Sequence, residues 1–318
     1  MELSVALDLA LAGTPLSVDD ALTLEAYGTD ELCDAADKVR LQHCGNRIHT
    51  CSIVNARSGR CSEDCKWCSQ SGHHSTGIDE YEYIGEEELM IACGENDARG
   101  VQRFALVTSG RRVPPAHTAA FCRLLDKVRS STSMSLCVSM GLVDEDQLRM
   151  LHEAGVERYH CNLETSPRFF PSLCSTHSQA DKLATIAAAR RVGMSVCVGG
   201  IIGMGETMRD RLELAEAARE AGASALPLNI LNPIPGTPLG STPLLPEEEV
   251  VRSVALMRFI IPTLTIHFAG GRGRISRKST LRMLRGGANG AMVGNLLTTV
   301  GNDMNSDYDL FAEAGYEV

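Results

Sequence analysis

Short apolar runs alternate with longer amphipathic stretches from about residue 50 to the end of the chain. The runs have the length of strands, and the stretches between them repeat apolar residues at helical spacing. This pattern predicts eight strands, at 50–56, 103–108, 133–139, 158–164, 194–201, 223–229, 263–268 and 290–294. It also predicts helices between them, among them 86–99, 118–130, 144–154, 179–192, 207–221 and 246–260.

Glycines support this alternation, because Gly155, Gly193 and Gly222 each stand between a helical stretch and a strand, where a helix commonly ends. Eight strands separated by helices predict an α/β fold, a (β/α)8 barrel of the TIM type. A doubly wound sheet is the alternative. We expect residues 1–49 to form an N-terminal helical extension packed against one end of the barrel, and residues 50–318 to form the barrel domain with a C-terminal segment.

Charge and hydropathy narrow the class of protein. The net charge of −10 argues against a nucleic-acid partner, because phosphate binding needs a basic face. The longest mostly apolar run, 194–204, contains three glycines and is shorter than the roughly 18 residues of a membrane span. The first residues are acidic, without the cationic start of a secretory signal. We therefore expect a soluble, cytoplasmic protein that binds neither nucleic acid nor membrane.

Twelve cysteines are unusual for such a chain, and in a reducing compartment they indicate metal binding or catalysis. Cys61, Cys65 and Cys68 have the spacing C-x3-C-x2-C directly after the first predicted strand. That position is the first loop of the barrel mouth, where active sites of such barrels lie. Three thiolates can hold three irons of a [4Fe–4S] cluster and leave the fourth iron open. The alternative is a zinc knuckle completed by His73 or His74.

The chain resembles a known family in four segments: NARSG at 55–59, CSEDCKWCSQS at 61–71, YHCNLETSP at 159–167 and LLTT at 296–299. The cysteine spacing is similar to that of the radical S-adenosylmethionine superfamily. The combination of all four segments resembles the biotin synthase family over residues 35–311, nearly the whole chain.

The resemblance implies radical sulfur insertion into dethiobiotin, which forms biotin. The implied cofactors are S-adenosylmethionine, the [4Fe–4S] cluster and an auxiliary iron–sulfur cluster that donates the sulfur. It also implies reduced flavodoxin or ferredoxin as the electron donor, and a homodimer. Two alternatives remain: another radical enzyme on the same scaffold, or an iron–sulfur electron carrier or zinc protein.

The matching motifs imply roles for single residues. Cys61, Cys65 and Cys68 are the expected ligands of the catalytic cluster. Trp67 and the loop at 200–206, which includes Ile201, match positions that contact the adenine. The residues that match S-adenosylmethionine or substrate contacts are Asn162, Glu164, Asn229, Thr298 and Thr299. Of these, Asn162 and Asn229 match the dethiobiotin ureido group and the two threonines its carboxylate.

The sequence departs from the family at the auxiliary cluster, which three cysteines and an arginine usually hold. Cys137 and Cys197 match, but Ala105 and His267 stand where a cysteine and the arginine are expected. Cys51 is expected to point into the barrel, and Cys44 precedes it in a turn that could bring it to the same layer. We therefore predict an auxiliary cluster of four irons, held by four thiolates, which suit a four-iron cluster. The predicted ligands are Cys44, Cys51, Cys137 and Cys197.

The other cysteines carry no assigned chemistry. Cys33, Cys93 and Cys122 fall in helical stretches and are expected to be packing residues. Cys174 lies in a predicted loop, and strand alternation turns Cys161 away from the pocket. His267 is either a ligand of the auxiliary cluster or a polar neighbour.

Overall fold

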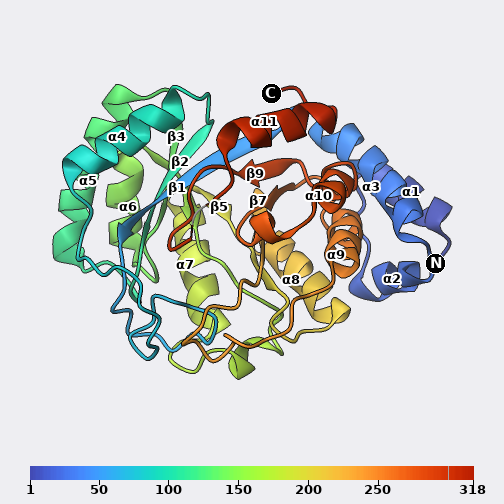
Figure 1. Cartoon of the computed structure of the whole chain (residues 1–318), viewed down its shortest axis with the longest axis horizontal. Coiled ribbons are helices and arrows are strands. Elements are labelled where there is room, and N and C mark those ends of the chain that lie inside the picture. The colour runs from blue at the N-terminus through green and yellow to red at the C-terminus, as the bar shows by residue number, and fades with distance from the viewer. Residues whose placement is uncertain (300) are drawn as a thin grey trace.

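The strands form a closed parallel barrel in a computed structural model that describes residues 1–299 and 301–318 (Figure 1). They run in the order β5-β4-β3-β2-β1-β9-β8-β7-β6, and β5 also pairs with β7, which closes the ring. Because β5 and β6 are two halves of one strand position, the barrel has the eight positions that the sequence predicts. The strands are β1 His49–Arg57, β2 Arg103–Thr108, β3 Ser135–Ser139, β4 Val156–His160, β5 Ser195–Cys197, β6 Gly200–Ile202, β7 Ala225–Ile230, β8 Thr265–Phe268 and β9 Gly290–Met292.

Helices surround the barrel and connect successive strands, as expected for a (β/α)8 fold (Figure 1). The six helices predicted from the sequence are all present, with bounds that shift by a few residues. Two further helices, α10 and α11, belong to the C-terminal part. The helices are α4 Glu86–Asp97, α5 Pro115–Ser131, α6 Glu145–Glu153, α7 Gln179–Arg191, α8 Met208–Glu220, α9 Glu247–Ile260, α10 Arg277–Leu284 and α11 Met304–Glu313.

Several helices begin at a side-chain cap just after the loops of the barrel mouth. Ser178 caps α7 and Thr207 caps α8, and in each case the aspartate at the third helical position bonds back to the cap. Such capping boxes satisfy backbone N–H groups that would otherwise lack a partner at the helix start. The caps therefore fix the points at which the loops at the C-terminal ends of the strands (the mouth loops) end and the outer helices begin.

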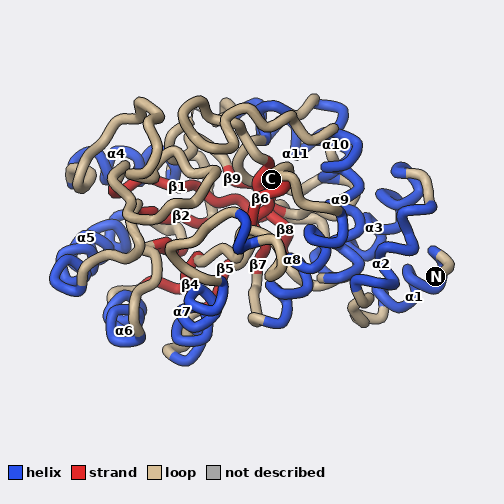
Figure 2. Tube along the Cα trace, turned by 90° about the horizontal axis from the view of Figure 1, so that it is seen from below, coloured by secondary structure: helices blue, strands red, loops and turns tan. Residues whose placement is uncertain are grey.

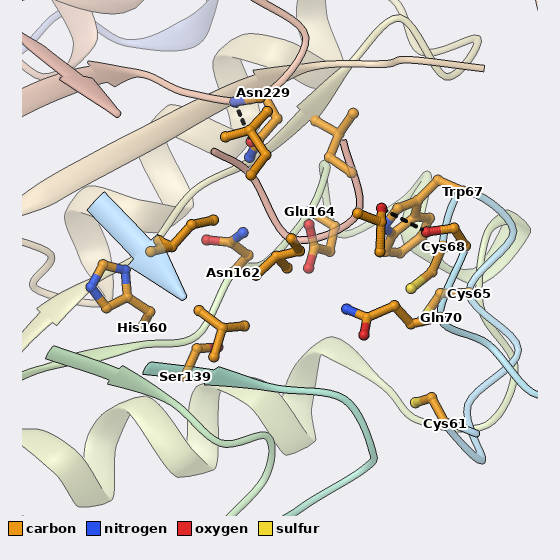
Figure 3. A pocket seen from close by; sticks show the side chains of 18 of the residues that line it. Cys61, Cys65, Trp67, Cys68, Gln70, Ser139, His160, Asn162, Glu164 and Asn229 are labelled. Atoms are coloured by element: carbon orange, nitrogen blue, oxygen red, sulfur yellow. Dashed lines mark hydrogen bonds between the residues drawn. The ribbon is translucent and has the colours of Figure 1, made fainter. Parts of the chain in front are cut away.

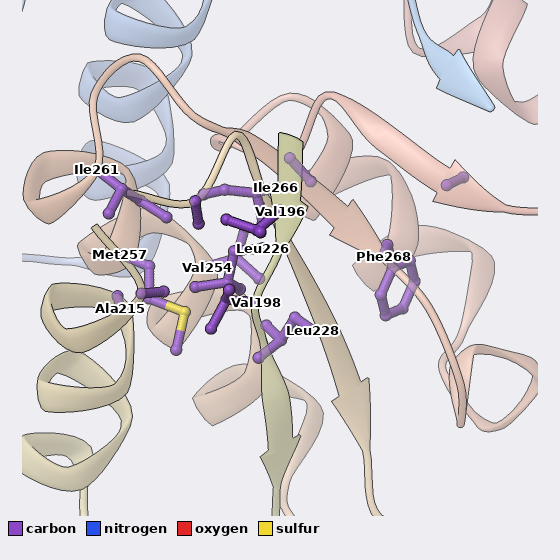
Figure 4. Close-up of a cluster of buried hydrophobic side chains, with 14 of the residues drawn as sticks. Val196, Val198, Ala215, Leu226, Leu228, Val254, Met257, Ile261, Ile266 and Phe268 are labelled. Carbon is purple, nitrogen blue, oxygen red and sulfur yellow. The ribbon is translucent and has the colours of Figure 1, made fainter. Parts of the chain in front are cut away.

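The apolar core fills the space between the strands and the outer helices (Figure 4). Val196 and Leu226 come from the strands, and Val254 and Met257 from α9; all four are at most 1% exposed. Because a parallel barrel is covered by helices, its strands read as nearly continuous apolar runs, which is why they were predictable. The core holds the strand ends, and thus the mouth loops, in fixed positions.

The N-terminal helices α1 Leu3–Leu11, α2 Val18–Thr23 and α3 Thr29–Cys44 pack on the flank of the barrel (Figure 2). Helix α3 lies against α9, and α2 lies against α8. The helices of the predicted extension are thus present. They cover the outer helices, however, rather than one end of the barrel, because their apolar residues join the same buried cluster as those of α8 and α9.

Strand β4 is shorter than predicted and ends at His160. The chain then turns across the barrel mouth, where Glu164 adopts a left-handed backbone (φ 72°) and forms a bridge with Gly200. A Cβ atom on Gly200 would lie 2.2 Å from the carbonyl oxygen of Glu164, so only glycine allows this contact. This contact lies next to the interruption between β5 and β6. Within the described residues, no helix is both long and apolar enough to cross a bilayer.

Candidate active site

A cavity of about 440 Å³ opens at the C-terminal ends of the strands (Figure 3). Loops after β1, β4, β7 and β9 contribute its walls. Apart from Cys44, Cys51, Cys137 and Cys197, every site residue predicted from the sequence lines it. These lining residues are Cys61, Cys65, Trp67, Cys68, Asn162, Glu164, Ile201, Asn229, Thr298 and Thr299.

The cysteine loop forms one wall of the cavity, and backbone hydrogen bonds hold it in shape. The Cys61 N–H donates to the Gln70 carbonyl, and the Cys68 N–H donates to the Cys65 carbonyl, both at 3.0 Å. The Gln70 side-chain oxygen accepts from the backbone N–H of Gly59 at 3.2 Å. The three thiols are therefore carried by a short loop that is tied to the end of β1.

These thiols suit an iron–sulfur cluster. Each is partly exposed to the cavity, so a ligand can reach it. Burial raises the pKa of Cys61 and Cys65, and it raises the pKa of Cys68 to about 11, with the Cys61 thiol adding to that rise. Without metal the thiols thus carry protons at neutral pH, which iron would displace. His73 and His74, the alternative zinc ligands, instead contact the backbone oxygens of Ser62 and Cys68.

The opposite wall carries two asparagines (Figure 3). The Asn162 side-chain oxygen accepts from the Gly199 N–H at 3.2 Å. Asn229 joins two strand ends, because its amide donates to the Gly200 carbonyl at 3.1 Å and accepts from the Gly270 N–H at 2.8 Å. Each primary amide has two donors and two acceptor sites, so capacity remains for a ligand.

Glu164 reaches the cavity beside a buried lysine that sequence reasoning missed. The Lys182 ammonium lies 3.5 Å from a Glu164 carboxylate oxygen, and the two side chains are 11% and 13% exposed. Burial raises the pKa of Glu164, and the charge of Lys182 opposes that rise. Lys182 comes from α7, so no local motif links it to Glu164.

Trp67 and Ile201 form an apolar corner with Leu173, Met204 and Leu231. The Glu206 carboxylate stabilises the loop after β6, because its two oxygens accept hydrogen bonds from the backbone N–H groups of Gly203 and Met204 at 2.8 and 2.7 Å. Glu206 in turn pairs with the buried guanidinium of Arg211 at 2.7 Å. This corner provides a flat apolar surface and a rigid backbone edge, which suits an aromatic base.

Thr298 and Thr299 lie in the loop after β9, at the rim of the cavity. The Thr298 hydroxyl is 3.0 Å from that of Ser69, which follows the cysteine loop. The same segment is tied to β1, because the Asn55 amide donates to the Leu297 carbonyl at 3.1 Å. The two threonines therefore stand next to the cysteine loop although they are far from it in sequence.

A second group of side chains that could bind a metal lies inside the barrel, one layer below the cavity. Cys51 and Cys137 are each two residues before cavity-lining Ile53 and Ser139, so strand alternation points them inward. Cys197 pairs in register with cavity-lining His160. The Cys51 sulfur lies 3.9 Å from the Nδ1 atom of His267.

The four residues Cys51, Cys137, Cys197 and His267 come from the first, third, fifth and seventh strand positions. Alternate strands of such a barrel contribute one interior layer of four side chains. Gly290 makes room for this layer, because a Cβ atom there would lie 2.6 Å from the His267 ring. Burial raises the pKa of Cys51 to about 12 and lowers that of His267 well below its usual value. The layer is a buried set of soft donors that suits a metal cluster.

Cys44 has different neighbours. Its sulfur lies 3.7 Å from the buried guanidinium of Arg258 and 3.9 Å from the Leu264 carbonyl. Among the described residues, no contact joins it to the three cysteines of the layer. Its membership of the ligand set stays a prediction, whereas His267 occupies the fourth place of the layer.

His160 also escaped sequence reasoning. Its side chain lines the cavity, its Nε2 atom is buried without a partner among the described residues, and burial lowers its pKa to about 3. A neutral imidazole with a free nitrogen can bind a metal or accept a hydrogen bond from a ligand. Nothing in the sequence marks His160 beyond its place in the segment that resembles the family.

Two family models match the chain. The model of the radical SAM superfamily matches residues 56–218, and the model of the biotin and thiamin synthesis associated domain matches residues 227–317. The first match contains the cysteine loop and Asn162, and the second contains Asn229 and the two threonines. The division falls at the start of β7, so both matches are needed to build one cavity.

Known proteins of similar sequence cover nearly the whole chain. The biotin synthase of Parabacteroides distasonis is 42% identical, over 97% of this chain and 94% of that protein. Biotin synthase 2 of Corynebacterium diphtheriae is 44% identical over 97% and 93% of the two chains. Among solved structures, methylornithine synthase superimposes with a TM-score of 0.82 at 18% identity, over 98% and 96%, which shows the shared fold. The chain belongs to the biotin synthase family of radical S-adenosylmethionine enzymes.

Proposed function

We propose that this protein converts dethiobiotin to biotin by radical sulfur insertion. The observation that carries the proposal is the single cavity with the Cys61–Cys65–Cys68 loop on one wall and Asn162 and Asn229 on the other. The relatives of 41–45% identity that bear the name biotin synthase support it. A cavity of this kind brings a small substrate next to a cluster with an open iron.

In this proposal Cys61, Cys65 and Cys68 would hold a [4Fe–4S] cluster and leave one iron open to S-adenosylmethionine. When bound, the cluster would supply the electron for reductive cleavage of S-adenosylmethionine. Trp67 and the backbone around Ile201 bind the adenine. Glu164, whose charge Lys182 balances, accepts hydrogen bonds from the hydroxyl or amino groups of S-adenosylmethionine.

Dethiobiotin lies between the two cysteine-bearing sites. The free amide groups of Asn162 and Asn229 pair with its ureido group, since a urea offers both donors and an acceptor. The hydroxyls of Thr298 and Thr299 bind its carboxylate at the rim. Because these contacts fix the substrate at both ends, they direct the radical to the carbon atoms in between.

The auxiliary cluster is the sulfur donor in this proposal, and Cys51, Cys137 and Cys197 hold it one layer below the substrate. We propose His267 as the fourth donor, because it completes the interior layer, and Cys44 as the alternative predicted from the sequence. The four-iron composition belongs to the set of four thiolates that includes Cys44, because four thiolates suit a four-iron cluster. Three thiolates and the His267 nitrogen suit a two-iron cluster as well. Iron and sulfide analysis with Mössbauer spectroscopy distinguishes a four-iron from a two-iron cluster.

Reduced flavodoxin or ferredoxin as electron donor, a homodimer and a cytoplasmic location are further parts of the proposal. They rest on the resemblance to the family alone.

Anaerobic reconstitution tests the function. The protein with S-adenosylmethionine and a reductant is expected to form 5′-deoxyadenosine, and dethiobiotin is expected to raise the yield and to give biotin. The Cys68→Ala variant is expected to form neither product, because two thiolates hold the cluster poorly. The Cys122→Ala variant, altered at a helix far from the cavity, is the control. If dethiobiotin does not change the yield of 5′-deoxyadenosine, the result would favour the alternative that the protein is another radical enzyme on this scaffold.

Paired cysteine variants test the ligands of the auxiliary cluster. Cys51→Ala is expected to lose the auxiliary cluster and biotin formation while 5′-deoxyadenosine formation continues. Cys44→Ala is expected to keep both, because its sulfur contacts Arg258 and Leu264 rather than the layer. Loss of the auxiliary cluster in Cys44→Ala would instead support the set of four cysteines.

A further inference from the structure

Three possible metal ligands meet beside the cysteine loop, and only one of them, Cys65, belongs to the cluster triad. Cys174 is buried in the loop after β4, and its sulfur lies 3.7 Å from that of Cys65. The His177 ring approaches the same sulfur, with Nδ1 at 3.3 Å and Nε2 at 3.9 Å. One donor atom from each of Cys65, Cys174 and His177 lies within 4.8 Å of the other two. Neither Cys174 nor His177 has a role in the proposed reaction.

The separations of these atoms match those around one tetrahedral metal ion. Metal–sulfur bonds of about 2.3 Å and metal–nitrogen bonds of about 2.0–2.1 Å place two sulfurs about 3.8 Å apart, and a sulfur and a nitrogen about 3.6 Å apart. The observed separation of 3.7 Å between sulfurs agrees with the first value. The His177 Nε2 atom lies 3.9 Å from the Cys174 sulfur, about 0.3 Å more than the second value.

The histidine is oriented as metal-binding histidines usually are. Its Nδ1 atom lies 2.7 Å from a Glu63 carboxylate oxygen, so the N–H is donated there and the lone pair stays on Nε2. Glu63 is also paired with the Arg111 guanidinium at 3.4 Å. A carboxylate that accepts the second ring N–H fixes the tautomer and the direction of a metal-binding imidazole.

The Asp64 carboxylate joins the cysteine loop to the loop after β4 in the absence of metal. One of its oxygens accepts from the backbone N–H groups of Ser175 at 2.9 Å and Thr176 at 3.2 Å. Cys174 and His177 are therefore held at a fixed place relative to Cys65. A site whose ligands are positioned in advance loses less conformational entropy when it binds a metal.

We propose that Cys65, Cys174 and His177 bind one divalent cation, Fe²⁺ or Zn²⁺, in the chain that lacks the cluster at Cys61, Cys65 and Cys68. Mixed sulfur and nitrogen donors suit these ions rather than Mg²⁺ or Ca²⁺. Binding displaces one proton from each thiol and leaves the fourth position to water. Because Cys65 serves both sites, this ion and the cluster exclude each other. Fe²⁺ held here stands next to the place where the cluster is built.

Cobalt binding tests the site without relying on enzyme activity. The probe is Co²⁺, added anaerobically to reduced, metal-free Cys61→Ala/Cys68→Ala protein, which cannot hold the cluster triad. We expect this protein to bind one Co²⁺ ion in addition to any Co²⁺ bound at the interior layer. The additional ion is expected to show thiolate charge-transfer absorption and the ligand-field absorption of a tetrahedral site. A further Cys174→Ala substitution in this protein is expected to abolish binding of that Co²⁺ ion. A further His177→Ala substitution is expected to lower the affinity for it at least tenfold. Adding Cys122→Ala, the control, is expected to change nothing.

Equal cobalt binding with and without Cys174 would overturn the proposal, provided that circular dichroism shows both proteins folded. If Cys174→Ala does not fold, Cys174→Ser serves instead, because its hydroxyl can replace the hydrogen bond that the Cys174 thiol donates to the Asp64 carboxylate at 3.2 Å. The same loss of the tetrahedral spectrum is expected. The wild-type protein with its cluster in place is expected to lack this cobalt equivalent. Since radical activity is measured in protein with an intact triad, failure here leaves the proposed function unaffected.

Discussion

Replacement of Lys182 by methionine separates the roles of the buried ion pair at the cavity. Methionine keeps the length and apolar stem of the side chain but removes the charge that faces Glu164. The carboxylate then stays buried without a counter-charge, and burial pushes its pKa further above the usual range. We expect the variant to be less stable and to bind S-adenosylmethionine more weakly, because Glu164 takes up a proton and loses an acceptor site.

The structure sets the size of the effect on stability. Removing one partner of a fully buried pair costs about 3–5 kcal/mol. Here the charged atoms are 3.5 Å apart and about a tenth of each side chain is exposed, so the lower end applies. We expect the free energy of unfolding to fall by about 3 kcal/mol. The double variant Glu164→Gln/Lys182→Met is expected to recover most of that loss, because it no longer contains an unpaired charge.

Urea unfolding of the metal-free chain, followed by circular dichroism under a reductant, measures these differences. Lys127→Met is the matched control, since Lys127 pairs with Glu86 at 2.6 Å on the surface, with both side chains 55% exposed. Such a pair contributes at most about 1 kcal/mol. A loss in Lys182→Met no larger than in the control, or no recovery in the double variant, would refute the reasoning.

Three further changes have defined outcomes. Asn229→Ala is expected to weaken dethiobiotin binding at least tenfold, measured by calorimetry, and to lower stability by about 1–3 kcal/mol, because Gly200 and Gly270 lose their partner; unchanged affinity places the ureido pocket elsewhere. Gly290→Ala is expected to displace the His267 ring and to prevent binding of the auxiliary cluster, which iron analysis measures. Full iron content in this variant would contradict the role of His267 in the interior layer. Burial alone would raise the pKa of Asp210, but hydrogen bonds from Ser166 and Thr207 and the charge of Arg168 bring this pKa below 3.8. The ionised Asp210 carboxylate therefore stabilises the folded protein above pH 3.8, and this stabilisation is lost as the pH falls through the lowered pKa. Asp210→Asn is expected to flatten the acid limb of the stability profile, and parallel profiles would contradict this.

The barrel was predictable because each strand is covered by helices, so its apolar run marks its position in the sequence. The cluster loop was predictable for a different reason, since Cys61, Cys65 and Cys68 lie within eight residues and their spacing carries the chemistry. The contact between Glu164 and Gly200, next to the interruption between β5 and β6, was not predictable, since it joins two segments far apart in the chain.

The same limit explains which residues of the site could not be predicted from the sequence. Lys182, Cys174 and His177 approach the cavity from the loop after β4 and from α7, and no local spacing relates them to the residues they face. For the inner layer, alternation along a strand correctly turned Cys51 inward. The position of Cys44 depends on how α3 packs on α9, which alternation along a strand does not describe.

Transfer of isotopically heavy sulfide tests the central claim most directly, that one barrel holds two clusters on either side of the substrate. The auxiliary cluster is reconstituted with heavy sulfide, free sulfide is removed, and a single turnover is run anaerobically with dethiobiotin and S-adenosylmethionine. Mass spectrometry of the product is expected to show biotin with the heavy isotope in wild-type protein, and 5′-deoxyadenosine without biotin in Cys51→Ala. Biotin with sulfur of natural abundance, or labelled biotin from Cys51→Ala, would contradict the account.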